Sequence, residues 1–316
     1  MKLIILLLIF IVSFLLIFLI KNIDIYLHIV NSIIPPPRGG EWMLDENSTK
    51  KYYSVSISKN SFITINLKIL KDTFCFLLDT GSSNSVIKGN IAQKIGFIQK
   101  KKNYSFYGGN IFNIISLPQV VLNDEIIIGP FVGKNIEWSL INENESEILK
   151  EIDGIIGRNI LNNFIVNIDY SSGILELYMH NEDIKSLHYS QSLNLKNIST
   201  IDILYDGAKH TALIDTGSID FIKKYEIGIV KENCFEHKFL LIRGDVNEKL
   251  INSTANIQMG DYIINGTVFK NISLKNIFVY KDIVFGIPFL SNFNWLFDFK
   301  REKVYFELAN EELLNN

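Results

Sequence analysis

Two aspartates that follow the same local pattern are the residues of this chain best suited to chemistry. Asp79 lies in the run Phe-Leu-Leu-Asp-Thr-Gly-Ser-Ser at residues 76–83, and Asp215 lies in Ala-Leu-Ile-Asp-Thr-Gly-Ser-Ile at residues 212–219. In both runs, apolar residues lead a carboxylate into a Thr-Gly-Ser turn, where its removal from water is costly unless neighbouring groups compensate. Because the pattern is present twice, it indicates a site built from two carboxylates.

The residues after each aspartate are suited to holding two carboxylates together. Each glycine lets the backbone turn sharply and brings main-chain N–H groups close to the carboxylate. The threonine hydroxyls can hydrogen-bond to the opposite copy, and the serine hydroxyls can donate to the outer carboxylate oxygens. The supporting residues of the predicted site are therefore Thr80, Gly81, Ser82, Thr216, Gly217 and Ser218.

Two carboxylates that face each other cannot both be ionised, so Asp79 and Asp215 would share a proton and titrate as a pair. One is then a base while the other is an acid. Such a pair can activate a water and protonate an amide leaving group without a metal, a cofactor or a nucleophilic side chain. The five histidines show no metal-ligand spacing, and we predict neither a metal nor a cofactor.

An internal repeat sets the two aspartates in matching surroundings. Asp79 and Asp215 are 136 positions apart (215 − 79 = 136), whereas the later landmarks Gly157 and Gly286 are 129 apart (286 − 157 = 129), because the first copy carries an insertion. From residue 54 onward, short β-rich runs alternate with Asn, Asp and Gly turn signals, and helical periodicity is scarce. The pattern predicts a mostly β chain, and if the two repeats pack with pseudo-twofold symmetry, Asp79 and Asp215 face each other.

The motifs resemble those of aspartic proteases, and specifically two retropepsin-like domains fused in one chain. Asp-Thr-Gly at both sites is similar to the catalytic signature of that family, and Asp79 begins Asp-Thr-Gly-Ser-Ser-Asn, which is similar to the first active-site motif of pepsin-like enzymes. Residues 154–161, Gly-Ile-Ile-Gly-Arg-Asn-Ile-Leu, are close to a segment that lies beside the catalytic loop in retroviral proteases. The resemblance covers about residues 60–308.

The resemblance implies the fold, the activity and the site. It implies two closed β-barrel-like lobes, peptide-bond hydrolysis by water held between Asp79 and Asp215, and an extended polypeptide substrate. It also implies a flap, for which Tyr107, Gly108 and Gly109 are the candidate residues, although an ordinary hairpin turn with a surface tyrosine is the alternative. With both aspartates in one chain, a monomeric catalytic unit suffices.

Some residues depart from the family pattern. In retroviral enzymes the arginine of the Gly-Arg-Asn segment has an acidic partner just after the catalytic loop, but Ser83 and Ile219 occupy that position here, so Arg158 lacks this partner. In the second copy, Ile287-Pro288 stands where the first copy has Arg158-Asn159. Three further aspartates lie in turns beside strands, and we expect them to cap those turns. These three residues are Asp153, Asp169 and Asp298.

The N-terminus indicates a membrane anchor. Residues 3–20 are apolar apart from Ser13, and roughly 20 such residues suffice to span a bilayer. The run is longer than a typical signal-peptide core and no small-x-small cleavage site follows, which favours a single-pass signal anchor over a cleaved signal peptide. We expect the catalytic region to be extracytoplasmic, with the Pro-Pro-Pro-Arg-Gly-Gly run at residues 35–40 standing it off the membrane.

The expected division of the chain follows from these segments. It comprises a transmembrane signal anchor at 1–21, a linker and first strand region at 22–58, a first retropepsin-like lobe at 59–185 and a second at 186–316. A net charge of −3 gives no basic surface for nucleic acid, so such a partner is not expected. Two functions remain: a membrane-anchored aspartic endopeptidase, or a non-catalytic peptide-binding or scaffolding protein that keeps the fold. The intact Asp-Thr-Gly-Ser runs favour hydrolysis.

Overall fold

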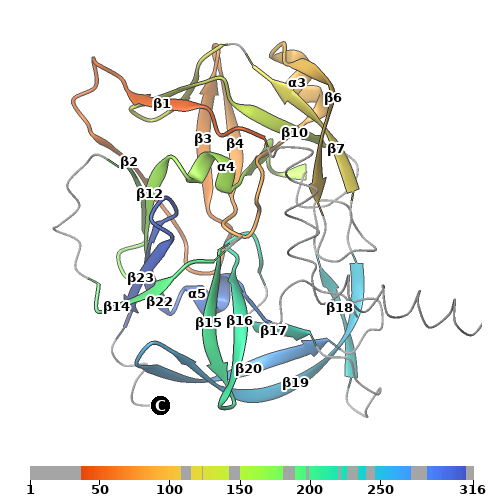
Figure 1. Cartoon of the computed structure of the whole chain (residues 1–316), viewed down its shortest axis with the longest axis vertical. Helices are drawn as coiled ribbons and strands as arrows, with labels where there is room; N and C mark the ends of the chain where they lie inside the picture. The colour runs from red at the N-terminus through yellow and green to blue at the C-terminus, as the bar shows by residue number, and fades with distance from the viewer. Residues whose placement is uncertain are drawn as a thin grey trace, which may run out of the picture.

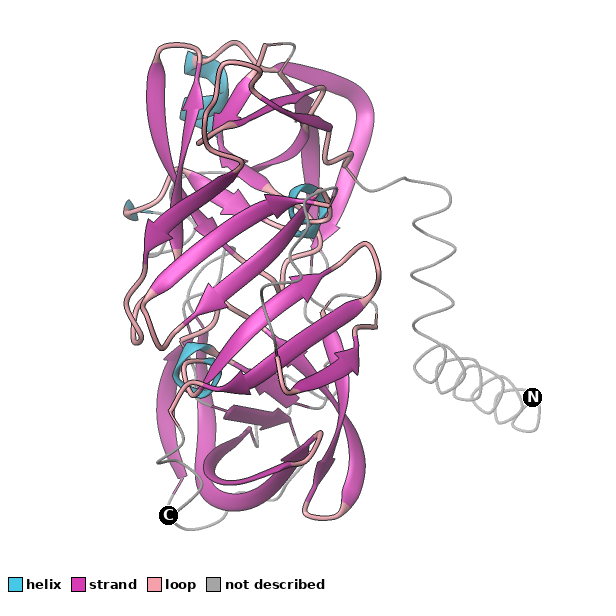
Figure 2. Ribbon diagram, turned by 90° about the vertical axis from the view of Figure 1, so that its left-hand side faces the viewer, coloured by secondary structure: helices cyan, strands magenta, loops and turns pink. Residues whose placement is uncertain are grey.

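A computed structural model of the chain describes residues 37–107, 115–122, 124–141, 150–180, 189–196, 199–219, 222–225, 234–239, 246–271 and 283–310. These residues are folded mostly as β-strands with short helices between them (Figure 2), so the prediction of a mostly β chain is confirmed. In this part of the chain, no helix has the length and apolar character needed to cross a membrane. The anchor expected at residues 3–20 lies outside the described residues.

The strands follow from the spacing of apolar residues. β3 (Thr64–Ile69) alternates polar and apolar residues, and its Ile65, Leu67 and Ile69 side chains are buried, which is the pattern of a strand with one face on the core. β22 (Phe293–Asp298) is instead buried at every position. One face carries Phe293, Trp295 and Phe297, and the other buries Asn294 and Asp298, which are hydrogen-bonded to Ser171 and Arg301.

Two large sheets use strands from different halves of the chain (Figure 1). The ten-stranded sheet has the order β1 (Glu41–Leu44), β9 (Phe131–Lys134), β8 (Ile126–Ile128), β3, β4 (Asp72–Leu78), β11 (Gly154–Ile156), β5 (Val86–Lys88), β10 (Glu137–Ile141), β7 (Ile115–Val121), β6 (Ile98–Tyr107). The seven-stranded sheet has the order β15 (Thr200–Tyr205), β16 (Ala208–Ile214), β21 (Ile283–Phe285), β17 (Ile222–Tyr225), β20 (Tyr262–Asn271), β19 (Val246–Met259), β18 (Cys234–Phe239).

A third sheet joins strands from both halves of the chain. Its order is β14 (Gln191–Asn194), β23 (Lys303–Leu308), β22, β12 (Phe164–Asp169), β13 (Ile174–Met179), β2 (Tyr52–Ser56). The central pair is β12 and β22, which run antiparallel from Ile165 opposite Asp298 to Ile168 opposite Trp295. Since both strands are almost wholly buried, this pair ties the two halves of the chain together through the core.

The seven-stranded sheet curls back on itself. Beyond its linear order, β15 pairs with β19, with Leu204 opposite Gln258 and Tyr205 opposite Ile257. This pairing closes a ring of strands. The ten-stranded sheet keeps an open order over the described residues.

The strands that precede the two aspartates have the same neighbours. β4 runs parallel to β11 with Leu78 opposite Ile156, and β16 runs parallel to β21 with Ile214 opposite Phe285. Each of the neighbouring strands then leads through a glycine into a short helix, α4 (Arg158–Leu161) or α5 (Ile287–Leu290). The remaining helix of the described residues is α3 (Gly89–Lys94).

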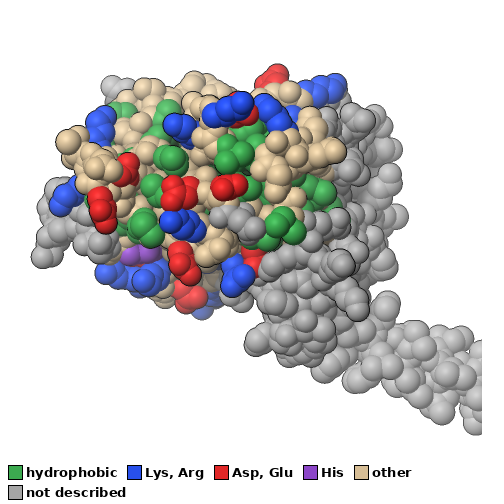
Figure 3. Space-filling model, turned by 90° about the horizontal axis from the view of Figure 1, so that it is seen from above, with side chains coloured by type: hydrophobic (Ala, Val, Ile, Leu, Met, Phe, Trp, Pro, Cys, Tyr) green, Lys and Arg blue, Asp and Glu red, His purple; other side chains and the backbone are tan. Residues whose placement is uncertain are grey.

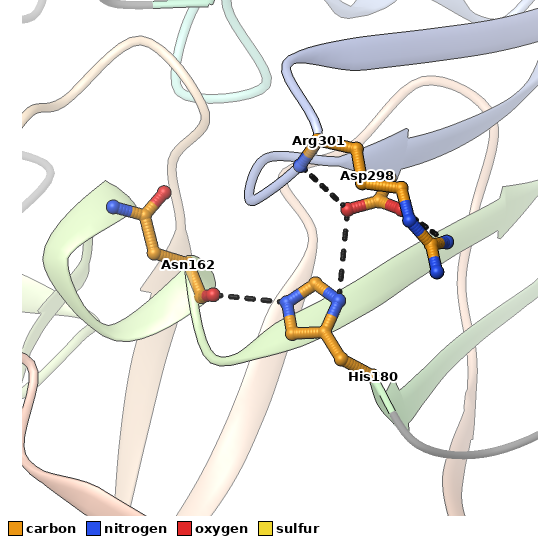
Figure 4. A network of polar contacts seen from close by, with 4 residues as sticks. All are labelled: Asn162, His180, Asp298 and Arg301. Atoms are coloured by element: carbon orange, nitrogen blue, oxygen red, sulfur yellow. Dashed lines mark hydrogen bonds and ion pairs between the residues drawn. The ribbon is translucent and has the colours of Figure 1, made fainter.

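A polar network secures the end of β22 (Figure 4). Asp298 accepts hydrogen bonds from the Arg301 backbone N–H and from its Nη1, both at 3.0 Å, and the Nδ1 atom of His180 lies 3.6 Å from its carboxylate. The Nε2 atom of His180 lies 3.0 Å from the carbonyl oxygen of Asn162. The turn-capping role predicted for Asp298 is therefore confirmed. It is also confirmed for Asp169, which accepts from the backbone N–H of Ser172 at 2.9 Å.

The face seen in Figure 3 carries both signs of charge. Acidic and basic side chains are interspersed among apolar ones over the coloured residues. On this face the described side chains form no field of a single sign, which is the kind of field that draws a strongly charged partner.

Candidate active site

The two aspartates leave their strands at equivalent points. The backbone N–H of Asp79 donates to the carbonyl of Ile156, and that of Asp215 donates to the carbonyl of Phe285, both at 3.0 Å. Each aspartate is thereby held beside the apolar strand that precedes a short helix. The two turns are oriented by the same backbone contacts in both halves of the chain.

The two carboxylates meet. The Asp79 and Asp215 side chains are hydrogen-bonded to one another, and Asp79 is buried. Each carboxylate also accepts a hydrogen bond from the main chain: the N–H of Ser82 donates to Asp79 Oδ1 at 2.9 Å, and the N–H of Gly217 donates to Asp215 Oδ1 at 3.0 Å. The carboxylates therefore form one site from residues far apart in the sequence.

Each glycine of the Asp-Thr-Gly turns packs against the opposite carboxylate. A Cβ atom on Gly81 would lie 2.6 Å from Cγ of Asp215, and a Cβ on Gly217 would lie 2.6 Å from Cγ of Asp79. Those distances leave no room for any side chain, since carbon atoms in contact are about 3.5–4.0 Å apart. The glycines are required here for close approach.

The two threonines lock the turns together in a reciprocal arrangement. Thr80 Oγ1 donates to the carbonyl of Ile214 at 2.8 Å and accepts from the backbone N–H of Thr216 at 3.2 Å. Thr216 Oγ1 donates to the carbonyl of Leu78 at 2.8 Å and accepts from the N–H of Thr80 at 3.0 Å. Both side chains are fully buried. The predicted cross-copy hydrogen bonds of the threonine hydroxyls are present.

We expect Thr80→Val to weaken the fold because valine keeps the shape and loses the hydroxyl. The Ile214 carbonyl and the Thr216 N–H would be left buried and unpaired, which predicts a loss of roughly 2–4 kcal/mol in the free energy of unfolding, measured by denaturant titration. Thr80→Ser restores the hydroxyl and should recover most of that loss.

The control for this substitution is Thr73→Val, at an exposed position of β4. It should change the free energy of unfolding by less than about 0.5 kcal/mol. A Thr80→Val chain as stable as the Thr73→Val chain would show that the reciprocal hydrogen bonds contribute nothing to stability.

The electrostatics of the pair favour a protonated site. Burial raises the pKa of the Asp79 carboxyl well above its ordinary value; the charge of Asp215 and the hydrogen bond between the two side chains raise it further, whereas the N–H groups of Ser82 and Gly81 lower it. A carboxyl that keeps its proton beside a carboxylate can act as an acid while its neighbour acts as a base. The site can thus move protons in both directions.

The raised pKa predicts how stability changes with pH. An unfolded aspartate has a pKa of about 3.9, so the stabilising contribution of the Asp79 proton is complete below that pH and is lost as pH rises through the higher folded-state pKa. The free energy of unfolding should therefore fall with rising pH by up to about 1.4 kcal/mol per unit, relative to an Asp79→Asn chain. Denaturant titrations of both chains at several pH values measure the difference. If the free energy of unfolding changed with pH in the same way in both chains, the pKa of Asp79 would not be raised.

The predicted serine contacts differ from those observed. Ser82 contacts Asp79 through its backbone N–H, while its hydroxyl donates to the carbonyl of Asn84 at 2.8 Å. The turn directs the N–H at the carboxylate and the side chain away from it, so the prediction of a hydroxyl donor at Ser82 was wrong. In the second turn, the N–H of Ser218 donates to the backbone carbonyl of Asp215 at 3.2 Å.

The flap candidates lie at the edge of what the structure describes. β6 and β7 form an antiparallel pair that ends with Tyr107 opposite Ile115. Gly108 and Gly109 lie outside the described residues. The interval between the Asp79 turn and residues 154–161 thus contains a long strand pair at the position expected for a hairpin.

Asp153 and Arg158 make contacts that sequence reasoning did not anticipate. Asp153 Oδ2 accepts from the N–H of Cys75 at 2.8 Å, across to β4, so the turn-capping prediction for Asp153 was wrong. The Arg158 guanidinium lies over the ring of Phe299, 5.1 Å from its centroid, and is close enough to Glu302 to be stabilised by its charge. None of these contacts has a local sequence signal, because the partners are distant in the chain.

Residue Asn159 holds the Asp79 turn and was also not predicted as a functional residue. Its N–H donates to the carbonyl of Ser83 at 3.2 Å, and its Oδ1 accepts from both the N–H and the hydroxyl of Ser85 at 2.7 Å. The Gly-Arg-Asn segment quoted above contains it, so the only available signal was the resemblance itself.

Comparison with known proteins supports one part of this site. Residues 65–160 match the family described as aspartyl protease, and a search of curated proteins found no match. The matched stretch contains Asp79 and ends before Asp215. This part of the chain is therefore similar to aspartyl proteases, a class of peptide hydrolases, while the second aspartate is joined to it by the contacts described above.

Proposed function

We propose that the chain is an aspartic-type endopeptidase that hydrolyses peptide bonds with water activated between Asp79 and Asp215. The observation that carries the proposal is that two carboxyl groups face each other, each packed against the glycine of the opposite Asp-Thr-Gly turn, with the pKa of Asp79 raised by burial and by the charge of Asp215. An ion pair that only stabilises the fold would combine opposite charges. Two facing carboxyl groups repel each other unless they share a proton, and such pairs with perturbed pKa values are concentrated at functional sites. The family match of residues 65–160 supports the same class of activity.

The reaction follows from the pair. The ionised carboxylate takes a proton from the water as the water attacks the scissile carbonyl, and the protonated carboxyl donates to the carbonyl oxygen. Collapse of the resulting gem-diol breaks the C–N bond: the leaving nitrogen takes a proton from the protonated carboxyl, and one diol hydroxyl gives its proton to the other carboxylate, which yields a carboxylic acid and an amine. The dyad ends with one shared proton, as it began. Turnover therefore requires one proton on the pair, which predicts a bell-shaped dependence of kcat on pH.

A polypeptide substrate fits a site of this architecture. We propose that the peptide lies extended across the carboxylates and that residues 107–109, at the end of the β6–β7 pair, cover it as a flap. The support for this is the pairing that ends at Tyr107 and Ile115. We further propose that residues 59–185 and 186–316 are tandem retropepsin-like lobes and that one chain is a complete catalytic unit; the matching strand neighbours of the two aspartates support this.

The location of the enzyme is part of the proposal. The apolar run at residues 3–20 would anchor the chain in a membrane as a single-pass segment, with the catalytic region outside the cytoplasm. Protease protection of the chain in sealed membrane vesicles tests this orientation.

A cleavage assay tests the proposed activity. The full chain in detergent is incubated with a mixture of unstructured peptides from about pH 3 to about pH 7, and products are identified by mass spectrometry. A chain carrying both Asp79→Asn and Asp215→Asn gives the background. Peptide cleavage by the unchanged chain alone is the expected result. No cleavage at any pH, or equal cleavage by the double variant, would show that the pair is not an endopeptidase site.

A further inference from the structure

A short segment before the first sheet is bonded to the sheet at one buried acid. The carbonyl of Arg38 accepts from the N–H of Glu137 at 2.9 Å, and the N–H of Arg38 donates to Glu137 Oε2 at 3.1 Å. The Arg38 Nε atom also donates to Glu137 Oε1 at 2.7 Å. Glu137 is buried, so these contacts help to offset the cost of removing its carboxylate from water.

The two glycines after Arg38 are packed tightly. A Cβ on Gly39 would lie 1.6 Å from the carbonyl oxygen of Asn159, and Gly40, at φ +78°, would place a Cβ 2.3 Å from Cγ1 of Ile136. The carbonyl of Gly39 accepts from Nε1 of Trp42 at 2.8 Å. The Gly-Gly pair, which the sequence suggested as part of a spacer, is here required for close packing.

The residue that Gly39 touches holds the loop after Asp79. Asn159 bonds to Ser83 and Ser85 as described above, and its Nδ2 donates to the carbonyl of Glu137 at 3.3 Å. Ser85 in turn accepts at its hydroxyl from the N–H of Gly157 at 2.9 Å. Arg38, Glu137, Asn159 and Ser85 therefore form a continuous chain of contacts that reaches the loop carrying the first aspartate.

The second half of the chain differs at the position equivalent to Asn159. At the offset of 129 that relates the two short helices, Pro288 stands where the first half has Asn159 (288 − 159 = 129). Proline has no side-chain donor or acceptor and no N–H. The contacts from Arg38 thus act on one turn of the pair only.

We propose that residues 38–42, which we call the strap, position the Asp79 turn through Glu137 and Asn159. Arg38, Gly39 and Glu137 are then positioning residues for turnover, and the catalytic unit begins at Arg38. A proteolytic cut on the C-terminal side of Arg38 would lower the rate, while a cut on its N-terminal side would not. The effect on turnover rests on the proposed function; the effect on the loop itself does not.

The test compares two arginines in matched surroundings. Arg38 and Arg301 are both exposed, at 72% and 66%, and each pairs with a buried carboxylate that is 3% or 2% exposed. Arg301 bonds to Asp298 in the network of Figure 4, whose hydrogen bonds and ion pairs involve none of residues 79–88. The full chain is prepared unchanged and as Arg38→Ala, Arg38→Lys, Gly39→Ala and Arg301→Ala.

The first readout is independent of activity. Hydrogen–deuterium exchange of amides in residues 79–88 should be at least about 10-fold faster in Arg38→Ala than in the unchanged chain, and unaltered in Arg301→Ala. Equal exchange in the Arg38→Ala and unchanged chains would overturn the strap, whether or not the chain cleaves peptides. Faster exchange in a chain that cleaves nothing would support the strap and reject the endopeptidase.

The second readout is turnover per folded molecule. Arg38→Ala should lower kcat at least about 10-fold with KM within about 2-fold, because the loop carrying a reacting group is displaced while the cleft is kept. Arg38→Lys should restore most of kcat, and Arg301→Ala should leave it unchanged. Gly39→Ala should behave as Arg38→Ala if it folds. Wild-type kcat in Arg38→Ala, or an equal loss in Arg301→Ala, would overturn the positioning role.

Discussion

Replacing Asp79 by asparagine is expected to abolish peptide hydrolysis and to make the folded chain more stable at neutral pH. Asparagine has nearly the shape of aspartic acid but cannot exchange a proton, so the pair loses its acid–base function. We expect kcat to fall by roughly 10²- to 10⁴-fold, the range contributed by a positioned acid or base. Stability should rise because burial and the Asp215 charge raise the pKa of Asp79, and the cost of ionising the pair at neutral pH disappears.

The matched control is Asp298→Asn. Asp298 is buried, as Asp79 is, but it faces Arg301 and His180 instead of a second carboxylate (Figure 4). Its replacement weakens the hydrogen bonds that its buried carboxylate accepts from Arg301, whose side chain is 66% exposed and stays solvated, so the free energy of unfolding should fall by roughly 1–3 kcal/mol. It should leave kcat unchanged in the molecules that remain folded. The two substitutions are therefore predicted to change stability in opposite directions, and only Asp79→Asn is predicted to lower kcat.

Measurement of kcat by peptide cleavage and of unfolding by denaturant titration at pH near 7 separates the outcomes. An Asp79→Asn chain with unchanged kcat would show that Asp79 and Asp215 do not act as the acid and base of the reaction. If this chain were less stable than the unchanged protein at neutral pH, Asp79 would be held mainly as a charged, stabilising group. In that case the raised pKa would be the wrong description of the site.

The parts of this site that were predictable are those with a local and repeated signal. Asp79 and Asp215 could be paired because each ends an apolar run and each precedes the same three residues. The threonine hydroxyls could be assigned to cross-copy contacts because a buried hydroxyl needs a partner and the two turns are equivalent. Strands were predictable from short β-rich runs, such as residues 62–67, which are separated by Asn, Asp and Gly turn signals.

The parts that were not predictable depend on contacts between distant polar residues. Arg38 and Glu137 are 99 positions apart, and Ser85 and Asn159 are 74 apart. A single polar residue leaves no periodic pattern, so its partner in space has no sequence signature. The Ser82 hydroxyl was misassigned for a related reason. Residue type states which donors exist, but the turn geometry decides which donor faces Asp79.

Glycine is expected to be irreplaceable at the two turns for a reason separate from proton chemistry. Gly81→Ala would place a Cβ 2.6 Å from Cγ of Asp215, so the opposite carboxylate would have to move by roughly 1 Å to restore ordinary contact. A displacement of that size at reacting atoms costs on the order of 10²-fold in kcat. Gly217→Ala should act in the same way on Asp79, because its Cβ would lie at the same distance.

The control for both substitutions is Gly89→Ala. A Cβ on Gly89 meets only the carbonyl oxygen of Ile141, at 3.6 Å, and the residue begins α3, where alanine is the better helix former. This chain should keep full activity and equal or slightly higher stability. Gly81→Ala and Gly217→Ala should each lose roughly 1–3 kcal/mol of the free energy of unfolding through overpacking.

Dividing the measured activity by the amount of folded protein separates an effect of Gly81 and Gly217 on catalysis from an effect on folding. A loss of kcat in molecules that remain folded, as measured by circular dichroism, would show that the approach of each turn to the opposite carboxylate sets the geometry of the reacting pair. Equal losses in both variants would show that the two turns contribute alike, despite the strap on the first. Full activity in a folded Gly81→Ala chain would instead mean that the pair tolerates a shift of about 1 Å, and the close-packed dyad would not be the catalytic arrangement.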